Sequence, residues 1–136
     1  MKNVSYRDGG ERGQALKNVR RLVVKVGTLL LTGKQGGAKQ RRIAELIGQI
    51  ALLRKAGKEV ILVSSGAIGA GMRVLQTNKR PASVPRLQAH AAVGQSRLMY
   101  LYETACAENG FHCGQMLLTT DDVQERERHL NMISCL

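Results

Sequence analysis

Aromatic residues are nearly missing from this chain of 136 residues, which has one phenylalanine, three tyrosines and no tryptophan. Proteins that hold single-stranded nucleic acid stack its bases on exposed aromatic rings. Four rings do not supply such a surface, and no RNA- or DNA-binding motif accompanies the basic residues. We therefore do not expect nucleic acid to be a partner.

Acidic residues are scarce as well. Ten aspartates and glutamates face 21 lysines and arginines, which gives a formal net charge of +11. Basic residues near the start of the chain are Lys2, Arg7, Arg12, Lys17, Arg20 and Arg21. Because this stretch has no apolar periodicity, we interpret residues 1–19 as a flexible, solvated basic tail. A preference for anionic small molecules and a contact with nucleic acid remain open alternatives.

Cysteine and histidine are few, at three residues each. The cysteines are Cys106, Cys113 and Cys135, and the histidines are His90, His112 and His129. No CxxC pair occurs, so reduced thiols in a cytosolic protein are the simplest interpretation. The histidines lack metal-ligand spacing to cysteines or carboxylates, and we expect no metal site built by the protein.

Long apolar runs are missing too. No run approaches the roughly 20 residues that a membrane-spanning helix needs, and the N-terminal stretch lacks the apolar core of a secretory signal. We therefore expect a cytoplasmic protein without membrane contact.

Short apolar runs alternate with helical patterns along the rest of the chain. The expected strands are residues 21–26, 59–64 and 111–118, and the expected helices lie around 43–53, after 66, over 87–105 and from 123 onward. Strands separated by helices indicate an α/β fold with a parallel sheet covered on both faces. Three strands make a thin sheet and the last helical pattern is uncapped, so we expect the front part of a longer protein.

The most informative segment follows the second strand, where Ser65, Gly66 and Ala67 lead into a helix. The first N–H groups of a helix have no partner inside it, and the helix dipole favours negative charge there. The segment therefore predicts a site for a carboxylate or a phosphate. Close packing of small residues is the alternative interpretation.

Lys25 is a charged residue inside a strand of valines and leucines. A buried, unpaired lysine is costly, so its ammonium must reach a partner or a site; a lysine that extends to solvent at the strand edge is the alternative. The following glycines do not form a P-loop, because five residues separate Gly27 from Gly33 and Gln35 follows Lys34.

Several strings of residues occur together in one order. They are Val23–Thr28, Leu31–Gly33, Ser65–Ile68, Ala91–Leu98, Gly114–Thr119, and Arg126–Arg128 with Leu130–Asn131. On these strings, from about Arg21 to about Asn131, the chain resembles the N-terminal half of the glutamate 5-kinase family, within the amino acid kinase superfamily. The strings Ala91–Leu98 and Gly114–Thr119 are the most specific of them.

The resemblance implies a three-layer α/β sandwich around a parallel sheet, the carbamate kinase-like fold, here truncated. Residues 20–136 would be the N-terminal, substrate-binding part of the amino acid kinase domain. The implied activity is ATP-dependent phosphorylation of the side-chain carboxylate of L-glutamate to glutamyl 5-phosphate, the first step of proline biosynthesis. ATP is then a co-substrate that carries Mg²⁺, and the full-length family implies a homo-oligomer.

The residues that match the family's functional positions are Lys25, Gly27 and Thr28 for ATP and its phosphates, and Ser65, Gly66 and Ala67 for glutamate. By resemblance, Lys25 is catalytic and contacts the transferring phosphoryl group. The attacking carboxylate has a pKa near ~4.3 and is already ionised at pH 7, so the chemistry needs alignment and charge neutralisation rather than a general base.

The chain also departs from the family pattern. Leu29 stands where the family usually has serine, His129 replaces a usual phenylalanine, and the family's later half, with an Asn-Asp motif and most of the nucleotide pocket, has no counterpart. We therefore expect the chain to be inactive alone. The alternatives are a non-catalytic fragment, one half of a split enzyme, or another amino acid kinase such as an acetylglutamate, aspartate or carbamate kinase.

Overall fold

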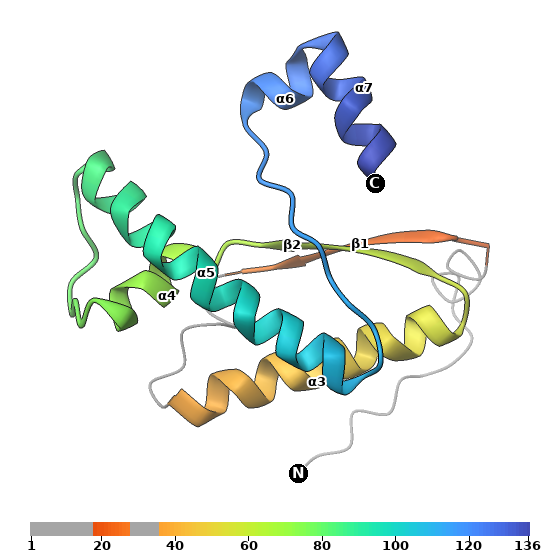
Figure 1. Cartoon of the computed structure of the whole chain (residues 1–136), viewed down its shortest axis with the longest axis horizontal. Coiled ribbons are helices and arrows are strands. Elements are labelled where there is room, and N and C mark those ends of the chain that lie inside the picture. The colour runs from red at the N-terminus through yellow and green to blue at the C-terminus, as the bar shows by residue number, and fades with distance from the viewer. Residues whose placement is uncertain (1–17, 28–35) are drawn as a thin grey trace, which may run out of the picture.

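The computed structural model describes residues 18–27 and 36–136, which form an α/β arrangement (Figure 1). Thr28, and the predicted basic tail except its last two residues, lie outside the described residues. The elements are β1 (Arg21–Val26), α3 (Gly36–Lys55), β2 (Glu59–Ser64), α4 (Ala67–Val74), α5 (Val84–Glu108), α6 (Thr120–Gln124) and α7 (Arg126–Cys135). No helix in these two ranges is long and apolar enough to cross a membrane.

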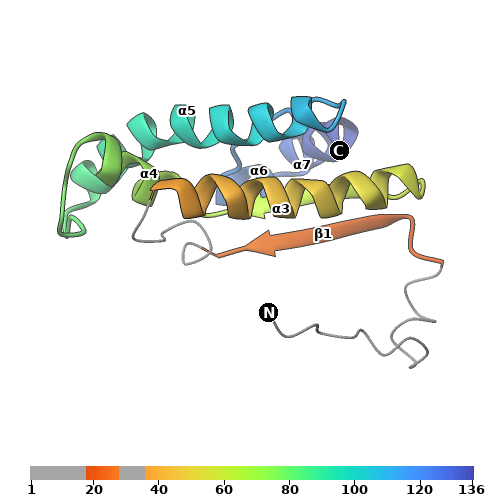
Figure 2. The same ribbon diagram turned by 90° about the horizontal axis from the view of Figure 1, so that it is seen from below.

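The two strands pair in parallel, with Arg21 opposite Glu59 and Val26 opposite Ser64. Two of the three predicted strands, residues 21–26 and 59–64, are thus confirmed, and so is the parallel α/β class. Side chains alternate along β1, so that Val24 and Val26 face the helical core while Val23 and Lys25 are exposed on the other face. In Figure 2, α3 and α5 lie on the same side of β1, so the described residues supply one helical layer of the expected sandwich.

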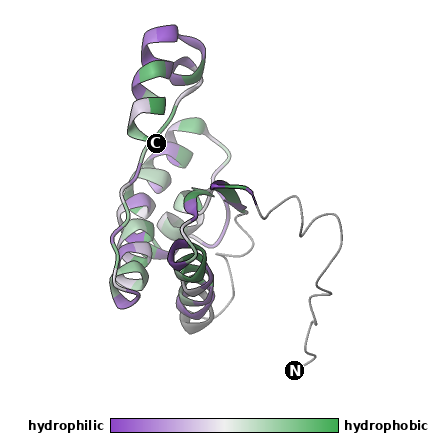
Figure 3. Ribbon diagram, turned by 90° about the vertical axis from the view of Figure 1, so that its right-hand side faces the viewer, coloured by the Kyte–Doolittle hydropathy of each residue, from purple (hydrophilic) through white to green (hydrophobic). Residues whose placement is uncertain are grey.

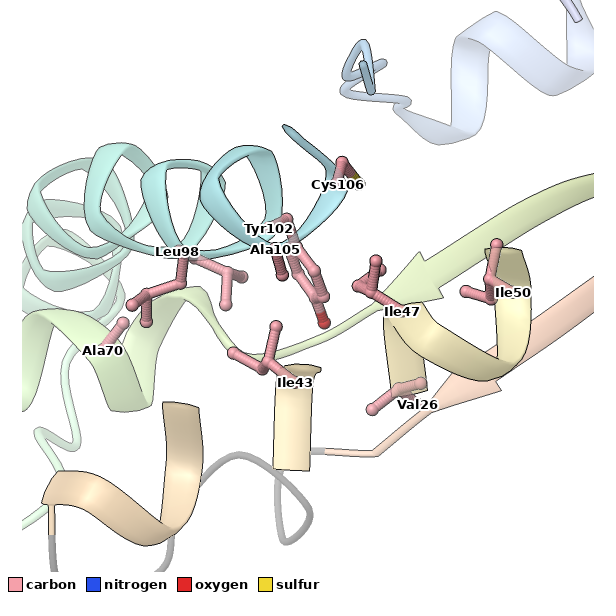
Figure 4. Packing of buried hydrophobic residues seen from close by; sticks show 10 residues of the cluster. Val26, Ile43, Ile47, Ile50, Ala70, Leu98, Tyr102, Ala105 and Cys106 are labelled. Atoms are coloured by element: carbon pink, nitrogen blue, oxygen red, sulfur yellow. The ribbon is translucent and has the colours of Figure 1, made fainter. Parts of the chain in front are cut away.

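The core lies between the sheet, α3 and α5. Figure 4 shows Ile43, Ile47 and Ile50 of α3 pointing toward the strands and toward Leu98 and Tyr102 of α5. The α3 residues recur at helical spacing, which is why the pattern predicted the buried face correctly. Ile43 and Leu98 are among the largest fully buried side chains.

Gly57 ends α3, as predicted. Its φ of +76° is open to glycine without steric cost. The Gly57 N–H donates to the Arg54 carbonyl at 2.9 Å and the Lys58 N–H donates to the Leu53 carbonyl at 3.0 Å. This pair of bonds satisfies two of the last carbonyls of the helix and turns the chain back into β2.

The segment after Gly110 differs from the sequence expectation, because residues 111–119 form no strand. Side chains of α5 form hydrogen bonds with the polar groups of this segment instead. The Glu103 carboxylate accepts hydrogen bonds from the His112 ring and from the Cys113 N–H at 3.0 Å. Further along, Gln95 Nε2 donates to Gln115 Oε1 at 2.9 Å. A strand exists only through a ladder with a neighbouring strand, and this segment is held against a helix.

The Glu103 contacts predict a pH effect. The hydrogen bonds from His112 and then Cys113 lower the pKa of Glu103 from 4.5 to about 2. A carboxylate with a lowered folded-state pKa stabilises the fold above its unfolded pKa and loses that contribution as the pH falls. In urea unfolding, wild type should therefore exceed Glu103→Gln in free energy of unfolding above pH 4.5, and the difference should shrink toward pH 2. A difference independent of pH would contradict this assignment.

Thr119 caps the last helical segment, which begins at Thr120, three residues before the predicted start at residue 123. The Thr119 N–H donates to the Asp122 carboxylate at 2.6 Å, and the Thr119 hydroxyl accepts from the Asp122 N–H in return. Extended backbone at Glu125 (φ −78°, ψ 127°) then separates α6 from α7, and Arg128 pairs with Asp122 at 3.0 Å across the break. The residues of the Arg126–Arg128 run are exposed.

The α6–α7 pair stands apart from the other elements (Figures 1 and 3). Its apolar side chains Val123, Leu130 and Ile133 are each at least half exposed. The hydrophobic stripe of this pair therefore has no cover among the described residues.

The turn that follows α4 contains a strained residue. Gln76 has a φ of 53°, and it is the one non-glycine residue with a positive φ in the described part of the chain. At such positive φ values, a residue with a Cβ is destabilised by roughly 1 kcal/mol. We expect Gln76→Gly to raise the free energy of unfolding by up to about 1 kcal/mol, whereas the same change at helical, exposed Gln88 lowers it by about as much. Urea denaturation measures both, and a destabilising Gln76→Gly would contradict the strain.

Candidate functional site

The Ser65–Ala67 turn joins β2 to α4, at the end of the sheet where the strands finish. Gly66 is the residue before the helix, with φ −84° and ψ −3°, and as a glycine it has no side chain that could cap α4. The first helical bond runs from the Ala70 N–H to the Gly66 carbonyl at 3.0 Å. The N–H groups of the first turn therefore have no acceptor inside α4 and can serve an anion.

Lys25 lies at the same edge of the sheet. It pairs in register with Val63, and both side chains are exposed on the sheet face away from the helices, while Ser65 follows the last residue of β2. The Ser65 hydroxyl donates to the Val26 carbonyl at 3.4 Å and joins the two strand ends. In open α/β sheets, ligands bind at the carboxyl ends of the strands. The structure thus brings Lys25 and the Ser65 turn to one edge.

Gly27 follows the last residue of β1 and is exposed. A Cβ built on it would have no atom within 4 Å, so the backbone at this position faces open space. It lies beside the bond between Ser65 and Val26. Of the three residues assigned to the phosphates, Lys25 and Gly27 therefore reach this edge, while Thr28 lies outside the described residues.

Tyr102 is a supporting residue that the sequence reasoning placed only in the core. Its ring is 5% exposed, and its hydroxyl donates to Ser64 Oγ at 3.0 Å. Burial raises the pKa of the Tyr102 hydroxyl. The bond anchors the last residue of β2 immediately before the turn. A tyrosine on the apolar face of a helix is the signal that could have pointed to it, because a buried hydroxyl needs a partner.

Two glycines hold α4 against α5 at backbone contact. A Cβ on Gly94 of α5 would lie 1.9 Å from the Ala67 carbonyl oxygen and 2.3 Å from the Gly71 nitrogen. A Cβ on Gly71 would lie 1.8 Å from the His90 carbonyl oxygen. Close packing therefore explains Gly71 and Gly94. Because Ala67 opens α4, the same contact also positions the turn.

The charge around the turn is one-sided. No aspartate or glutamate occurs between Glu59 and Glu103, a stretch that includes the turn, all of α4 and most of α5. The turn thus offers a hydroxyl and the N–H groups of a helix start, with Lys25 on the neighbouring strand, and this stretch adds no carboxylate. Such an arrangement can hold a carboxylate or a phosphoryl group but offers no base for proton abstraction.

Metal ligands do not gather in the described residues. Residues 18–27 and 36–136 contain no group of three or more His, Cys, Asp or Glu side chains that could hold a metal ion. The cysteines Cys106, Cys113 and Cys135 are free thiols. Burial raises the pKa of the Cys113 thiol to about 12, so this group is a poor nucleophile.

Comparisons with known proteins identify the family of this chain. The amino acid kinase family matches residues 20–136. The glutamate 5-kinase of Aromatoleum aromaticum is 49% identical over 121 residues, which are 89% of this chain and 33% of that protein. The glutamate 5-kinase of Nitrosospira multiformis is 50% identical over 121 residues, 89% of this chain and 32% of that protein. The chain therefore spans about a third of the length of the curated relatives it matches.

Proposed function

The chain belongs to the amino acid kinase family, and on this premise we propose that it carries the substrate-binding part of a glutamate 5-kinase. The reaction is transfer of the γ-phosphoryl group of ATP to the side-chain carboxylate of L-glutamate. Identities of 49% and 50% to two proteins named glutamate 5-kinase support this choice over other amino acid kinases. The observation that carries the proposal is the meeting of Lys25 and the Ser65 turn at one sheet edge.

In this proposal the Ser65 hydroxyl and the N–H groups that follow Gly66 hold glutamate. A carboxylate oxygen of glutamate attacks the γ-phosphorus, the new O–P bond forms, and the bond to the ADP oxygen breaks. The Lys25 ammonium neutralises charge on the phosphoryl oxygens, and the backbone at Gly27 and Thr28 faces the phosphates. Mg²⁺ arrives with ATP and adds positive charge at the same oxygens.

The exposed face of the sheet supports a further part of the proposal. Val23 is 66% exposed and Val63 is 47% exposed on the face that carries Lys25. Parallel sheets are normally covered on both faces, and phosphoryl transfer needs a site closed to water. We infer that the remaining length found in the relatives packs on this face and completes the nucleotide site. A cytoplasmic location and a homo-oligomer are part of the same proposal.

A chimera tests the proposed function. Residues 20–136 of this chain replace the corresponding segment of the Nitrosospira multiformis enzyme, which is 50% identical to this chain over 121 residues. We expect the chimera to release ADP in the presence of glutamate and not with aspartate or N-acetylglutamate. A folded chimera that releases ADP with another amino acid but not with glutamate would contradict the assignment. So would a folded chimera that releases no ADP with any of these amino acids.

A further inference from the structure

A second cationic site lies beyond the far end of α4. A pocket of about 550 Å³ opens between the loop after α4 and the first turns of α5. This loop lies at the left of Figure 1. Lys79, Arg80 and Arg86 line the pocket, and Pro81 and Ala89 contribute apolar wall. The eight residues of α4 separate this pocket from the Ser65 turn, so the two sites are distinct.

The three cations of this pocket have no carboxylate partner in the part of the chain that the structure describes. Lys79, Arg80 and Arg86 are exposed, and none of them forms an ion pair with another described residue. The stretch from Glu59 to Glu103 supplies no carboxylate between its ends. Like charges held together repel each other, so an anion that bridges them would relieve this repulsion.

The wall of the pocket is fixed by a buried histidine. His90 is 8% exposed, and its Nδ1 lies 2.7 Å from the Arg86 carbonyl oxygen, which can only accept. Nδ1 therefore carries a proton, and Nε2 is hydrogen-bonded to the Thr77 hydroxyl at 3.0 Å. Since Thr77 belongs to the loop, this bond ties the loop to α5 and keeps the backbones that bear the cations at a set separation. A preformed site loses less entropy on binding.

From these observations we propose that the pocket bounded by Lys79, Arg80 and Arg86 binds a compact phosphoanion with two or more negative charges. Two guanidinium groups can each donate a pair of parallel N–H bonds to phosphate oxygens, and the lysine adds a point charge. A single carboxylate would leave most of these donors unused. The site is independent of the glutamate turn and of the activity proposed for it.

Calorimetric titration of the chain with inorganic pyrophosphate at about 0.15 M salt tests the proposal, because this ionic strength screens diffuse attraction. We expect saturable binding of one pyrophosphate. Arg80→Ala and Arg86→Ala should each raise the Kd by about tenfold or more. Lys55→Ala removes the same charge at the end of α3, outside the pocket, and should leave the Kd within about twofold. Circular dichroism of each variant checks that it is folded.

Three outcomes would overturn the proposal. Equal weakening by Lys55→Ala and Arg86→Ala would indicate attraction to the net charge alone. No binding of pyrophosphate by the folded chain would remove the site. Malonate or a short single-stranded oligonucleotide that binds more tightly than pyrophosphate, through the same arginines, would assign the surface to dicarboxylates or to nucleic acid instead.

Discussion

Gly94→Ala is expected to lower the free energy of unfolding by about 3 kcal/mol or more. The added methyl group would lie 1.9 Å from the Ala67 carbonyl oxygen and 2.3 Å from the Gly71 nitrogen. Both atoms belong to the backbone of α4, so no rotamer change can relieve the overlap. The two helices must move apart, and the contact that positions the Ser65 turn is lost with them.

A second glycine provides the matched control. Gly48 lies inside α3, and a Cβ built on it meets no atom within 4 Å. Gly48→Ala should therefore raise the free energy of unfolding by up to about 1 kcal/mol, the difference in helix propensity. Urea unfolding followed by circular dichroism compares the two variants. Equal stability of Gly94→Ala and wild type would show that α4 and α5 are not in backbone contact.

Lys25→Ala is expected to lower kcat of the glutamate-dependent chimera by about 10³-fold, with a much smaller change in KM for glutamate. Lys25 is proposed to act on the phosphoryl oxygens as charge develops, whereas the Ser65 turn holds the amino acid in the ground state as well. An interaction made in the transition state alone changes kcat rather than KM. Steady-state kinetics with varied glutamate and ATP separates these effects.

Two control variants make the Lys25 result specific. Lys25→Arg keeps the charge and should retain more activity than the alanine variant, although the guanidinium has a different shape. Lys55→Ala removes a charge at the end of α3 and should leave kcat unchanged. A folded Lys25→Ala chimera with wild-type kcat would remove this lysine from the proposed site and support the alternative of a lysine that only extends to solvent.

The sequence predicted the elements that depend on local pattern. The β-branched run Arg21–Val26 and the helical spacing of Ile43, Ile47 and Ile50 each carry their own signal, and both elements are observed. Gly57 likewise ends α3 through a property of its own backbone. Because the two strands are parallel, their carboxyl ends lie at the same edge of the sheet, which brings Lys25 and Ser65 to that edge. Their roles in glutamate and phosphate binding remain predictions.

Contacts between distant segments could not be predicted in the same way. Residues 111–118 have strand-like composition, but composition does not say whether a strand partner lies beside them. In the structure Glu103 and Gln95 of α5 bind this segment instead. The role of Gly94 depends on the backbone of α4 that packs against it, and the role of Tyr102 depends on the Ser64 hydroxyl beside it. The residue pattern along α5 alone does not identify either partner.

The proposal that this chain carries one part of a glutamate 5-kinase site is tested by measuring glutamate-dependent ADP release. The measurement is made on the chain alone, and on the chain with the remaining two thirds of the Nitrosospira multiformis enzyme added as a separate polypeptide. We expect no release above background by the chain alone, because Lys25 lies on a sheet face that none of the described residues covers. We expect turnover when the two polypeptides are combined, and loss of that turnover with Lys25→Ala. Robust turnover by the chain alone, abolished by Lys25→Ala, would contradict the proposal.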